Sequence, residues 1–338
     1  DLCQKVWNGE RISDVEAVEL YHLPLQQLGA LADRRRGLAK ADAYDGQGND
    51  IVTYIVDRNI NYTNVCNVYC KFCAFWRSEK QADAYVIKHD EIDKKIEETV
   101  ALGGTQILMQ GGHHPKLDKR WYLDLLSHIR DTFPQINIHA FSPSEFIHFR
   151  DVFDEPLETL IKDFRDAGLG SIPGGGGEIL VDEVRKRIAP LKAMSDDWLE
   201  VMEIAHQLDM ATTATMMFGH VESIEHRVEH LDRVRRQQDE TGGFTAFIAW
   251  TFQAENTKLK APTVGANEYL RMQALSRIYL DNVPNIQSSW VTQGLEIGQV
   301  ALKYGANDLG SIMIEENVVS EAGTTFCMGV ADMQRLIE

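Results

Sequence analysis

Three cysteines in one short segment are the side chains of this sequence with the clearest chemical meaning. Cys66, Cys70 and Cys73 follow a C-x₃-C-x₂-C spacing. Three thiolates on one loop can each bind one iron of a 4Fe–4S cube, whose usual ligand set is four cysteines. No fourth cysteine lies nearby in the sequence, so the spacing predicts a cube with one iron left open to a substrate or cofactor. The alternative is a zinc site, with Cys70 and Cys73 as one pair and Cys66 and a distant histidine completing the set.

The other two cysteines, Cys3 and Cys327, stand alone near the two ends of the sequence. An odd number of cysteines with a tight trio is not the pattern of a disulfide-bonded scaffold. It is typical of a reducing compartment. We therefore expect a cytoplasmic protein in which Cys327 is an inert residue of the core.

The composition argues against several classes of protein. The 338 residues include 51 acidic and 34 basic side chains, for a net charge of −17. Such an acidic surface repels phosphate backbones, so we expect no nucleic-acid partner. No stretch approaches the ~20 apolar residues that span a bilayer. The first residues show no apolar signal region, so we expect no membrane partner.

A repeating pattern of strands and helices follows residue 50 and must position these cysteines. The expected strands are Ile51–Asn64, Thr105–Gln110, Ile136–Phe141, Leu169–Ile172, Ala211–Phe218, Phe244–Phe252, Ile286–Trp290 and Asp308–Ile314. The expected helices are Glu91–Leu102, Trp121–Thr132, Leu157–Ala167, Asp196–Leu208, Ser223–Gln238, Ala266–Leu280 and Leu295–Tyr304. This alternation predicts an α/β fold of the (β/α)₈ TIM-barrel type, which is typically ~250 residues long. A doubly wound open sheet is the alternative, because alternation alone does not close a barrel.

The first fifty residues follow a different, helical pattern. We expect residues 1–50 to form an N-terminal helical cap and residues 51–338 to form the barrel with a C-terminal extension. A first helical run is expected to end at Pro24. A second run ends in three arginines, and Gly37 directly after them is expected to stop the helix.

Several predicted strands carry polar side chains, although the strands of a packed parallel sheet are usually apolar. The run Asp57–Asn64 holds the first group, and the others are His139, Thr212, Thr213, Thr215, Gln253, Gln287 and Ser288. Buried polar groups need hydrogen-bond partners or water. Any one of them could point outward, but the whole set favours a polar ligand cavity in the upper part of the barrel.

Glycines and charged residues mark the ends of the strands, where barrel enzymes place their sites. The segment Gln110–His114 contains two glycines after the second strand, and glycine lets a ligand approach the backbone closely. Glu145 follows the third strand, and Glu178 follows four glycines after the fourth. Either carboxylate could bind ribose hydroxyls or an ammonium group, and a helix N-cap is the alternative role. His113 is a candidate ligand or general base.

The cysteine trio after the first strand, the aromatic residues that follow it and the glycines after the second strand resemble the radical S-adenosylmethionine (SAM) superfamily. The resemblance implies that SAM chelates the open iron of a 4Fe–4S cluster and is cleaved to a 5′-deoxyadenosyl radical. It implies metal ligation by Cys66, Cys70 and Cys73. The residues expected to bind SAM are Phe72, Gln110, Gly111, Gly112, Ser142, Glu145, Glu178 and Met217. The candidates for catalysis are His113, Glu145, Glu178 and Arg58.

Further motifs resemble the branch of this superfamily that handles futalosine-type and deazaflavin precursors. They are Asp57–Asn64, Cys70–Phe75, Gln110–Pro115, His139–Glu145 and Thr241–Phe244. Within the branch, the block Asn59–Cys73 and the segment Thr257–Tyr269 resemble the dehypoxanthine futalosine cyclases of menaquinone biosynthesis.

That resemblance implies a reaction on dehypoxanthine futalosine. The radical takes a hydrogen from the ribose, and the carbon radical closes a ring on the benzoate. Loss of a proton and an electron then gives cyclic dehypoxanthinyl futalosine. An external one-electron reductant is the implied partner. The alternatives are an aminofutalosine synthase, a deazaflavin-forming synthase, and a structural zinc or iron–sulfur protein without SAM chemistry.

Overall fold

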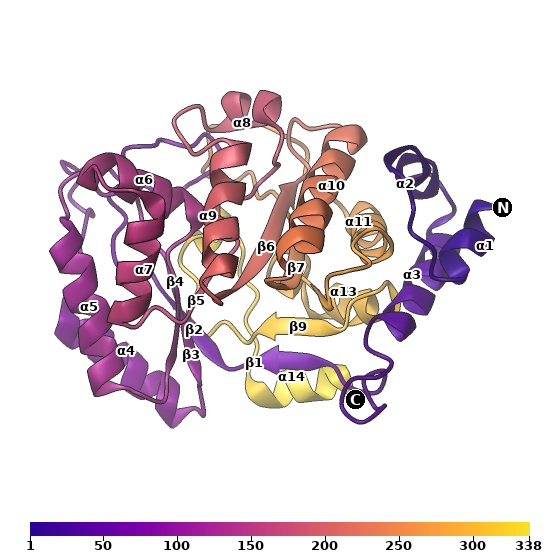
Figure 1. Ribbon diagram of the computed structural model, residues 1–338, viewed down its shortest axis with the longest axis horizontal. Helices are drawn as coiled ribbons and strands as arrows, with labels where there is room; N and C mark the ends of the chain where they lie inside the picture. Colours follow the sequence, from indigo (N-terminus) through magenta and orange to yellow (C-terminus); the bar gives the residue numbers. More distant parts are fainter.

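The computed structural model describes all residues from Asp1 to Glu338, and a parallel sheet lies at its centre (Figure 1). The sheet order is β1-β9-β8-β7-β6-β5-β4-β3-β2, and every neighbouring pair is parallel. The strands are β1 Thr53–Ile55, β2 Asp57–Ile60, β3 Gln106–Met109, β4 Asn137–Ala140, β5 Ser171–Ile172, β6 Ala211–Phe218, β7 Phe244–Thr251, β8 Asn285–Gln287 and β9 Asp308–Ser311.

The first and last strands of this order are two halves of one stretch of chain. Only Val56 separates β1 from β2. β1 pairs with β9, with Ile55 opposite Ser311, and β2 pairs with β3, with Asp57 opposite Gln106. The sheet therefore closes into a barrel through its first strand, and all eight predicted strands are present. The open doubly wound sheet is wrong, because its two edges would stay apart.

Helices surround the barrel, and the predicted ones are all confirmed. They are α4 His89–Ala101, α5 Lys119–Thr132, α7 Leu157–Ala167, α9 Ser195–Gln207, α10 Ile224–Thr241, α11 Ala266–Tyr279 and α13 Leu295–Val300, which continues as a 3₁₀ turn to Lys303. In α7 the buried residues Leu157, Leu160, Ile161 and Phe164 follow the helical spacing that places them on one face. The apolar side of α7 therefore packs into the core, whereas α11 is buried nearly all round.

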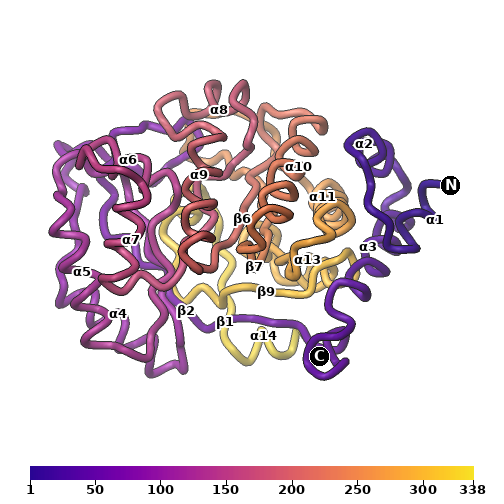
Figure 2. Tube along the Cα trace, viewed as in Figure 1, coloured from indigo at the N-terminus to yellow at the C-terminus, as the bar shows by residue number.

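Four short helices were not predicted: α6 Pro143–Phe153, α8 Asp182–Ile188, α12 Trp290–Gln293 and α14 Val330–Ile337. The signal for α6 is in the sequence, because Ser142 and Glu145 form a capping box and Pro143 occupies the first turn. The helix N-cap role that the sequence offered as the alternative for Glu145 is therefore present. Figure 2 shows α14 beside β1, where Gln334 Nε2 donates to the Tyr54 hydroxyl at 3.0 Å.

The N-terminal segment contains α1 Leu2–Trp7, α2 Asp14–Tyr21 and α3 Leu25–Ala39. It lies beside α10 and α11, on the outer wall of the barrel (Figures 1 and 2). Pro24 lies between α2 and α3, as predicted. The stop at Gly37 is wrong, because α3 continues through it to Ala39 at a position where a Cβ would meet no atom within 4 Å.

Residues of these helices, such as Val6 and Leu28, belong to the same hydrophobic core as the barrel. The division of the chain at residue 50 stays a prediction. No helix has the length and apolar character needed to cross a membrane.

Candidate active site

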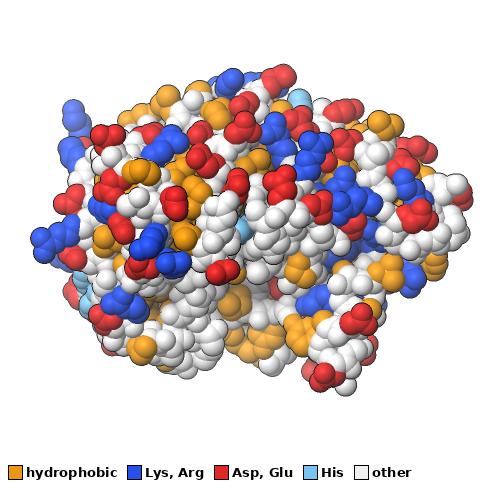
Figure 3. All heavy atoms as spheres, viewed as in Figure 1, with side chains coloured by type: hydrophobic (Ala, Val, Ile, Leu, Met, Phe, Trp, Pro, Cys, Tyr) orange, Lys and Arg blue, Asp and Glu red, His pale blue; other side chains and the backbone are white.

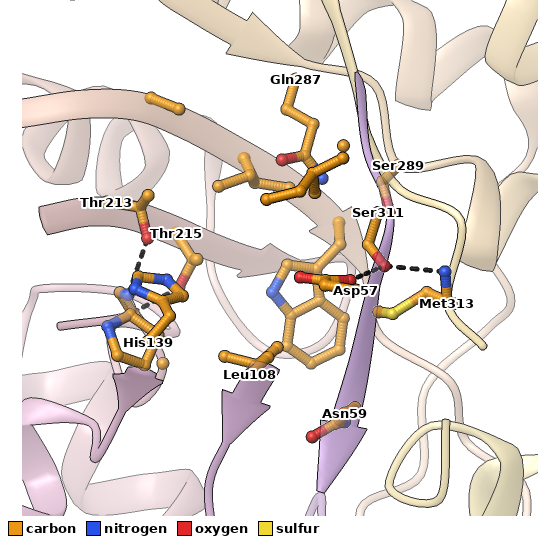
Figure 4. Close-up of a pocket in the computed structure, with 18 of the residues that line it drawn as sticks. Asp57, Asn59, Leu108, His139, Thr213, Thr215, Gln287, Ser289, Ser311 and Met313 are labelled. Atoms are coloured by element: carbon orange, nitrogen blue, oxygen red, sulfur yellow. Dashed lines mark hydrogen bonds between the residues drawn. The ribbon is translucent and has the colours of Figure 1, made fainter. Parts of the chain in front are cut away.

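The barrel encloses a polar cavity of about 640 Å³. Figure 4 shows Asp57, Asn59, Leu108, His139 and Thr213 facing this space from neighbouring strands. Of the polar strand residues singled out in the sequence, His139, Thr212, Thr213, Thr215, Gln287 and Ser288 line the cavity, whereas Gln253 does not. The expected polar lumen is therefore confirmed.

A chain of hydrogen-bonded side chains runs along the wall of the cavity. The Ser311 hydroxyl donates to Asp57 Oδ1, and Gln106 Nε2 donates to Asp57 Oδ2 at 3.2 Å. Asn137 Nδ2 donates to Gln106 Oε1 at 2.8 Å and to Ser171 Oγ at 3.2 Å. The chain ends where Ser171 Oγ meets His139 Nδ1 at 2.7 Å. Side chains from β9, β2, β3, β4 and β5 thus hold one another in place around the lumen.

The cavity is acidic. Its charged lining residues are Asp57, Glu178, Asp308 and Glu316, and it has no lysine or arginine in its wall. Burial raises the pKa of the Asp57 carboxyl to about 6. Burial lowers the pKa of His139 to about 4, so its ring is neutral near pH 7. Asp57 forms no ion pair, and Asn59 Oδ1 is buried without any hydrogen-bond partner. A ligand in the lumen can donate hydrogen bonds to the Asp57 carboxylate and to Asn59 Oδ1.

The three predicted metal ligands lie on the loop that follows β2. Cys70 is buried, and Cys66 and Cys73 are half-buried. Cys70 lies near enough to the other two thiols for their charges to interact with it, but burial is the main reason why its pKa rises to about 12. Backbone bonds anchor the loop, since Asn67 N donates to the His113 carbonyl at 3.2 Å and Lys71 N donates to the Ile188 carbonyl at 2.9 Å.

The residues present fit an iron–sulfur cube with one open iron. The three thiols share one loop, whereas Cys3 lies in α1 and Cys327 is exposed near the C-terminus. The prediction that Cys327 is a core residue is wrong, because the chain after β9 runs over the surface there. Gly112 packs against the loop so closely that a Cβ would clash with the Val65 carbonyl oxygen and lie 3.0 Å from the Cys66 Cβ. No group of three His, Cys, Asp or Glu side chains has an arrangement that could hold a single metal ion, such as the zinc of the alternative prediction.

Comparisons with known proteins agree with this geometry. The model of the radical SAM superfamily matches residues 60–234, and that of the CofH/MqnC C-terminal region matches residues 241–338. The chain is 45% identical over 338 residues to cyclic dehypoxanthine futalosine synthase of Halalkalibacterium halodurans, covering 99% of this chain and 90% of the relative. It is 48% identical over 320 residues to the synthase of that name from Streptomyces coelicolor, covering 93% and 78%.

Other relatives are named for a different reaction. A 5-amino-6-(D-ribitylamino)uracil–L-tyrosine 4-hydroxyphenyl transferase of Archaeoglobus fulgidus is 42% identical over 279 residues, covering 82% of this chain and 80% of the relative. The crystal structure of methylornithine synthase superposes with a TM-score of 0.75 at 17% identity, over 99% of this chain and 95% of that one, and supports the fold alone.

The chain belongs to the radical SAM superfamily. It is therefore an enzyme that uses a 4Fe–4S cluster and SAM. The barrel predicted for it is the fold of the related methylornithine synthase structure.

Glu178 connects the cluster loop of this radical SAM enzyme to the cavity. It lines the cavity, and its Oε1 accepts from Lys192 Nζ at 2.8 Å. The ammonium of Lys192 in turn lies 5.2 Å from the centre of the Phe72 ring, in the cluster loop. Arg185 donates to the carbonyls of Gly176 and Gly177, at 2.9 Å each, and so fixes the glycine run that precedes Glu178. The cluster loop and the lumen therefore meet at this carboxylate.

Glu145 has a structural role in the observed arrangement. Its Oε1 accepts from the Tyr62 hydroxyl at 2.8 Å and from Gly111 N at 3.1 Å. Its Oε2 accepts from Ser142 N and Ser142 Oγ, both at 2.7 Å, which caps α6. The helix-cap alternative is therefore present, and the carboxylate holds Gly111 in place. Gln110, one residue earlier, lines the cavity itself.

Among the residues predicted to bind SAM or to act in catalysis, Gln110 and Glu178 line the cavity and the others do not. Arg58 points outward from β2 and pairs with Glu98 at 2.8 Å and Glu315 at 3.3 Å. Met217 is buried in the hydrophobic core. His113 is buried beside the cluster loop, its ring 5.1 Å from that of His148. Burial lowers its pKa well below the usual value. The SAM-binding and catalytic roles predicted for these residues stay predictions.

The sequence reasoning did not select several residues of the cavity wall: Gln106, Asn137, Ser171, Thr245, Asp308, Ser311 and Glu316. The available signal was the alternation of side chains along each strand, which places positions i and i+2 on one face. Asp57 and Asn59 face inward for this reason, and Arg58 between them faces outward. The sequence shows the alternation but not which of the two sets faces inward.

Proposed function

We propose that this enzyme is a radical SAM cyclase that converts dehypoxanthine futalosine to cyclic dehypoxanthinyl futalosine in menaquinone biosynthesis. The observation that carries the proposal is the position of the three-thiol loop beside a polar barrel cavity, in a chain that aligns over 99% of its length with a synthase of this name. The cavity volume of about 640 Å³ lies in the range of sites for small molecules.

Cys66, Cys70 and Cys73 would hold the cluster, and Gln110, Gly111, Gly112 and Glu178 would contact SAM. When bound, the cluster supplies the electron that cleaves SAM to the 5′-deoxyadenosyl radical. Of the other predicted SAM contacts, Ser142 and Glu145 act by holding the Gly111 backbone.

The lumen wall supplies what a nucleoside substrate needs. Neutral donors and acceptors such as Asn59, Thr213 and Gln287 match sugar hydroxyls. The barrel wall also shields a reactive carbon radical from solvent. These side chains bind and orient the substrate, so that the attacked ring lies next to the radical carbon.

Asp57 is the group placed to accept the proton that ring closure releases. Closure on an aromatic ring releases one hydrogen as a proton and an electron. A carboxylate oxygen in the lumen can take the proton, and the electron would pass to the oxidised cluster. Glu178 is ion-paired with Lys192, and Glu316 accepts from three backbone N–H groups. Asp57 and Asp308 have neutral donors only, and of these two Asp57 belongs to the chain of hydrogen-bonded side chains along the lumen wall.

A second candidate reaction is the transferase-type chemistry of the deazaflavin branch, which the 42% identical relative from Archaeoglobus fulgidus favours. Anaerobic incubation of the reconstituted enzyme with SAM and a chemical reductant separates the two. We expect a cyclic product from dehypoxanthine futalosine and none from tyrosine with the ribitylaminouracil. The reverse outcome would assign the transferase reaction.

We also propose a cytoplasmic enzyme without a nucleic-acid or membrane partner. Its five free cysteines and its oxygen-sensitive type of cluster support a reducing compartment. We propose an external one-electron reductant as its partner, and the helical segment 1–50 as an N-terminal cap on the barrel domain 51–338.

A further inference from the structure

Five cations around the cluster loop form no ion pair, although acidic side chains outnumber basic ones 51 to 34 in this chain. They are Lys71, Lys186, Arg187, Lys258 and Lys260, all exposed. Most other cations are paired, as in Arg77–Asp83 and Lys116–Glu79. On the face of the molecule in Figure 3, acidic and basic side chains are interspersed. We call the five residues the loop cations.

Backbone hydrogen bonds bring the loop cations together from three distant segments. Lys71 N donates to the Ile188 carbonyl at 2.9 Å, and Lys71 Nζ donates to the Arg187 carbonyl at 2.7 Å, which joins the cluster loop to the end of α8. Lys258 N and Leu259 N both donate to the Lys71 carbonyl at 2.9 Å. The charges of the three segments therefore lie on one surface, directly outside the cysteines on either side of Lys71.

Apolar side chains accompany these charges. Tyr69 is 44% exposed and Leu191 is 66% exposed. Tyr69 contacts Trp76 edge-on, with 5.0 Å between ring centres, and Lys258 Nζ lies 4.9 Å from the centre of the Trp76 ring. Exposed aromatic residues with cations around them are typical of protein-binding surfaces. The acidic residues of the same segments are Asp182, Glu183 and Glu255.

We propose that the loop cations, with Tyr69 and Leu191, form the docking surface for an acidic electron-donor protein, a small flavin or iron–sulfur protein. The proposal rests on the radical SAM function, in which the cluster must be reduced by one electron before SAM can be cleaved. One electron passes from the reduced donor to the cluster, and no bond forms or breaks in that transfer. Charge complementarity selects the partner, because a surface of unpaired cations attracts an acidic protein, whereas the net charge of −17 on the whole chain repels one.

The test is a pair of charge-reversal variants of the cluster-loaded enzyme. Arg187→Glu with Lys258→Glu changes the proposed surface. Lys94→Glu with Lys303→Glu is the matched control, because both lysines are exposed, form no ion pair and lie on other elements. An acidic flavodoxin is the probe, and its Kd is measured by titration in low salt and in about 200 mM NaCl. We expect the surface variant to bind about 10-fold more weakly in low salt, with the difference shrinking as salt screens the charges. The control should bind like the parent.

A second readout separates docking from catalysis. The surface variant should accept electrons from reduced flavodoxin about 10-fold more slowly than the parent, but from dithionite at the parental rate. A milder variant, Arg187→Gln with Lys258→Gln, should have a Kd and an electron-transfer rate between those of the parent and the charge-reversal variant. It controls for misfolding of the charge-reversal variant. Equal Kd values for parent and surface variants, or an equal loss in the control, would overturn the proposal. Loss of cyclisation with dithionite in the parent enzyme would instead count against the proposed function.

Discussion

Asp57 and Ser311 are hydrogen-bonded across the seam where the barrel closes. Asp57 is the first residue of β2 and Ser311 is the last residue of β9. The Ser311 hydroxyl donates to Asp57 Oδ1 and accepts from Met313 N at 2.7 Å. The hydrogen bond that joins β2 to β9 where the barrel closes therefore also positions the Asp57 carboxylate in the lumen.

Replacing Asp57 by Asn should separate SAM cleavage from product formation. The amide keeps the shape and can still bond to Ser311, but it cannot accept a proton. We expect cyclisation to fall by about 10²- to 10⁴-fold, the usual range for a lost general base, while 5′-deoxyadenosine still forms. Chromatography of both products from one anaerobic reaction measures this. A variant that cyclises within about 3-fold of the parent would exclude Asp57 as the proton acceptor.

The same variant has a predicted effect on the pH dependence of stability. Burial raises the pKa of Asp57 from 3.8 to about 6, so the folded state binds more protons than the unfolded state between these values. The contribution of the group to stability is fully present below pH 4 and is lost as pH rises through 6. The gain in unfolding free energy from Asp57→Asn should therefore grow between pH 4 and pH 7, by at most about 3 kcal/mol. Denaturant titrations of parent and variant at both pH values test this, and a difference that shrinks towards pH 7 would contradict it.

The cysteine assignments predict iron contents. Replacing Cys66, Cys70 or Cys73 by Ala should reduce the reconstituted enzyme from about four irons per chain, the content of a full cube, to near zero, with loss of SAM cleavage. Cys327→Ala should leave the iron content and SAM cleavage unchanged, because Cys327 is exposed and away from the loop. Iron analysis and the visible absorption of the cluster give the result. Full iron in a loop variant would show that another side chain completes the site.

Gly112→Ala tests the close packing against the cluster loop. The added methyl group would clash with the Val65 carbonyl and crowd Cys66, so we expect a loss of about 1–3 kcal/mol in unfolding free energy and poor cluster retention. Gly37→Ala is the matched control, since it lies in α3 with open space around its Cβ, and it should stabilise the protein by about 0.4–1 kcal/mol. Thermal unfolding of both variants is the measurement, and a neutral Gly112→Ala would refute the packing argument.

Glu178→Gln tests the connection between the loop and the cavity. The change leaves Lys192 as a half-buried cation without its 2.8 Å partner and removes a carboxylate from the expected SAM site. We expect SAM to bind about 10-fold more weakly or worse, the size of one charge-assisted contact, with iron content retained. Equilibrium binding of SAM to the loaded protein measures the change. Unchanged SAM affinity would assign Glu178 a purely structural role.

Much of the chemistry could be predicted from local sequence. The spacing of Cys66, Cys70 and Cys73 places three thiols on one loop whatever surrounds it, because so few residues cannot move far apart. The alternation of eight strands with amphipathic helices likewise depends on periodicities within short segments. The capping of α6 by Glu145 could also be predicted from the segment Ser142–Glu145, and it was the alternative to a ligand contact.

What only the tertiary structure decided is which side of each strand faces inward and which distant segments meet. The Asp57 side chain points into the lumen and the Arg58 side chain points away from it, because the pairing of β1 with β9 sets the register of the first strand. The exposure of Cys327 and the meeting of Lys71, Arg187 and Lys258 depend on contacts between residues far apart in sequence. The alternation of polar and apolar residues can be recognised within a short segment of sequence. A shift of the strand pairing by one residue, however, turns every side chain to the other face of the sheet. The pairing with strands that are distant in sequence decides which face is inside.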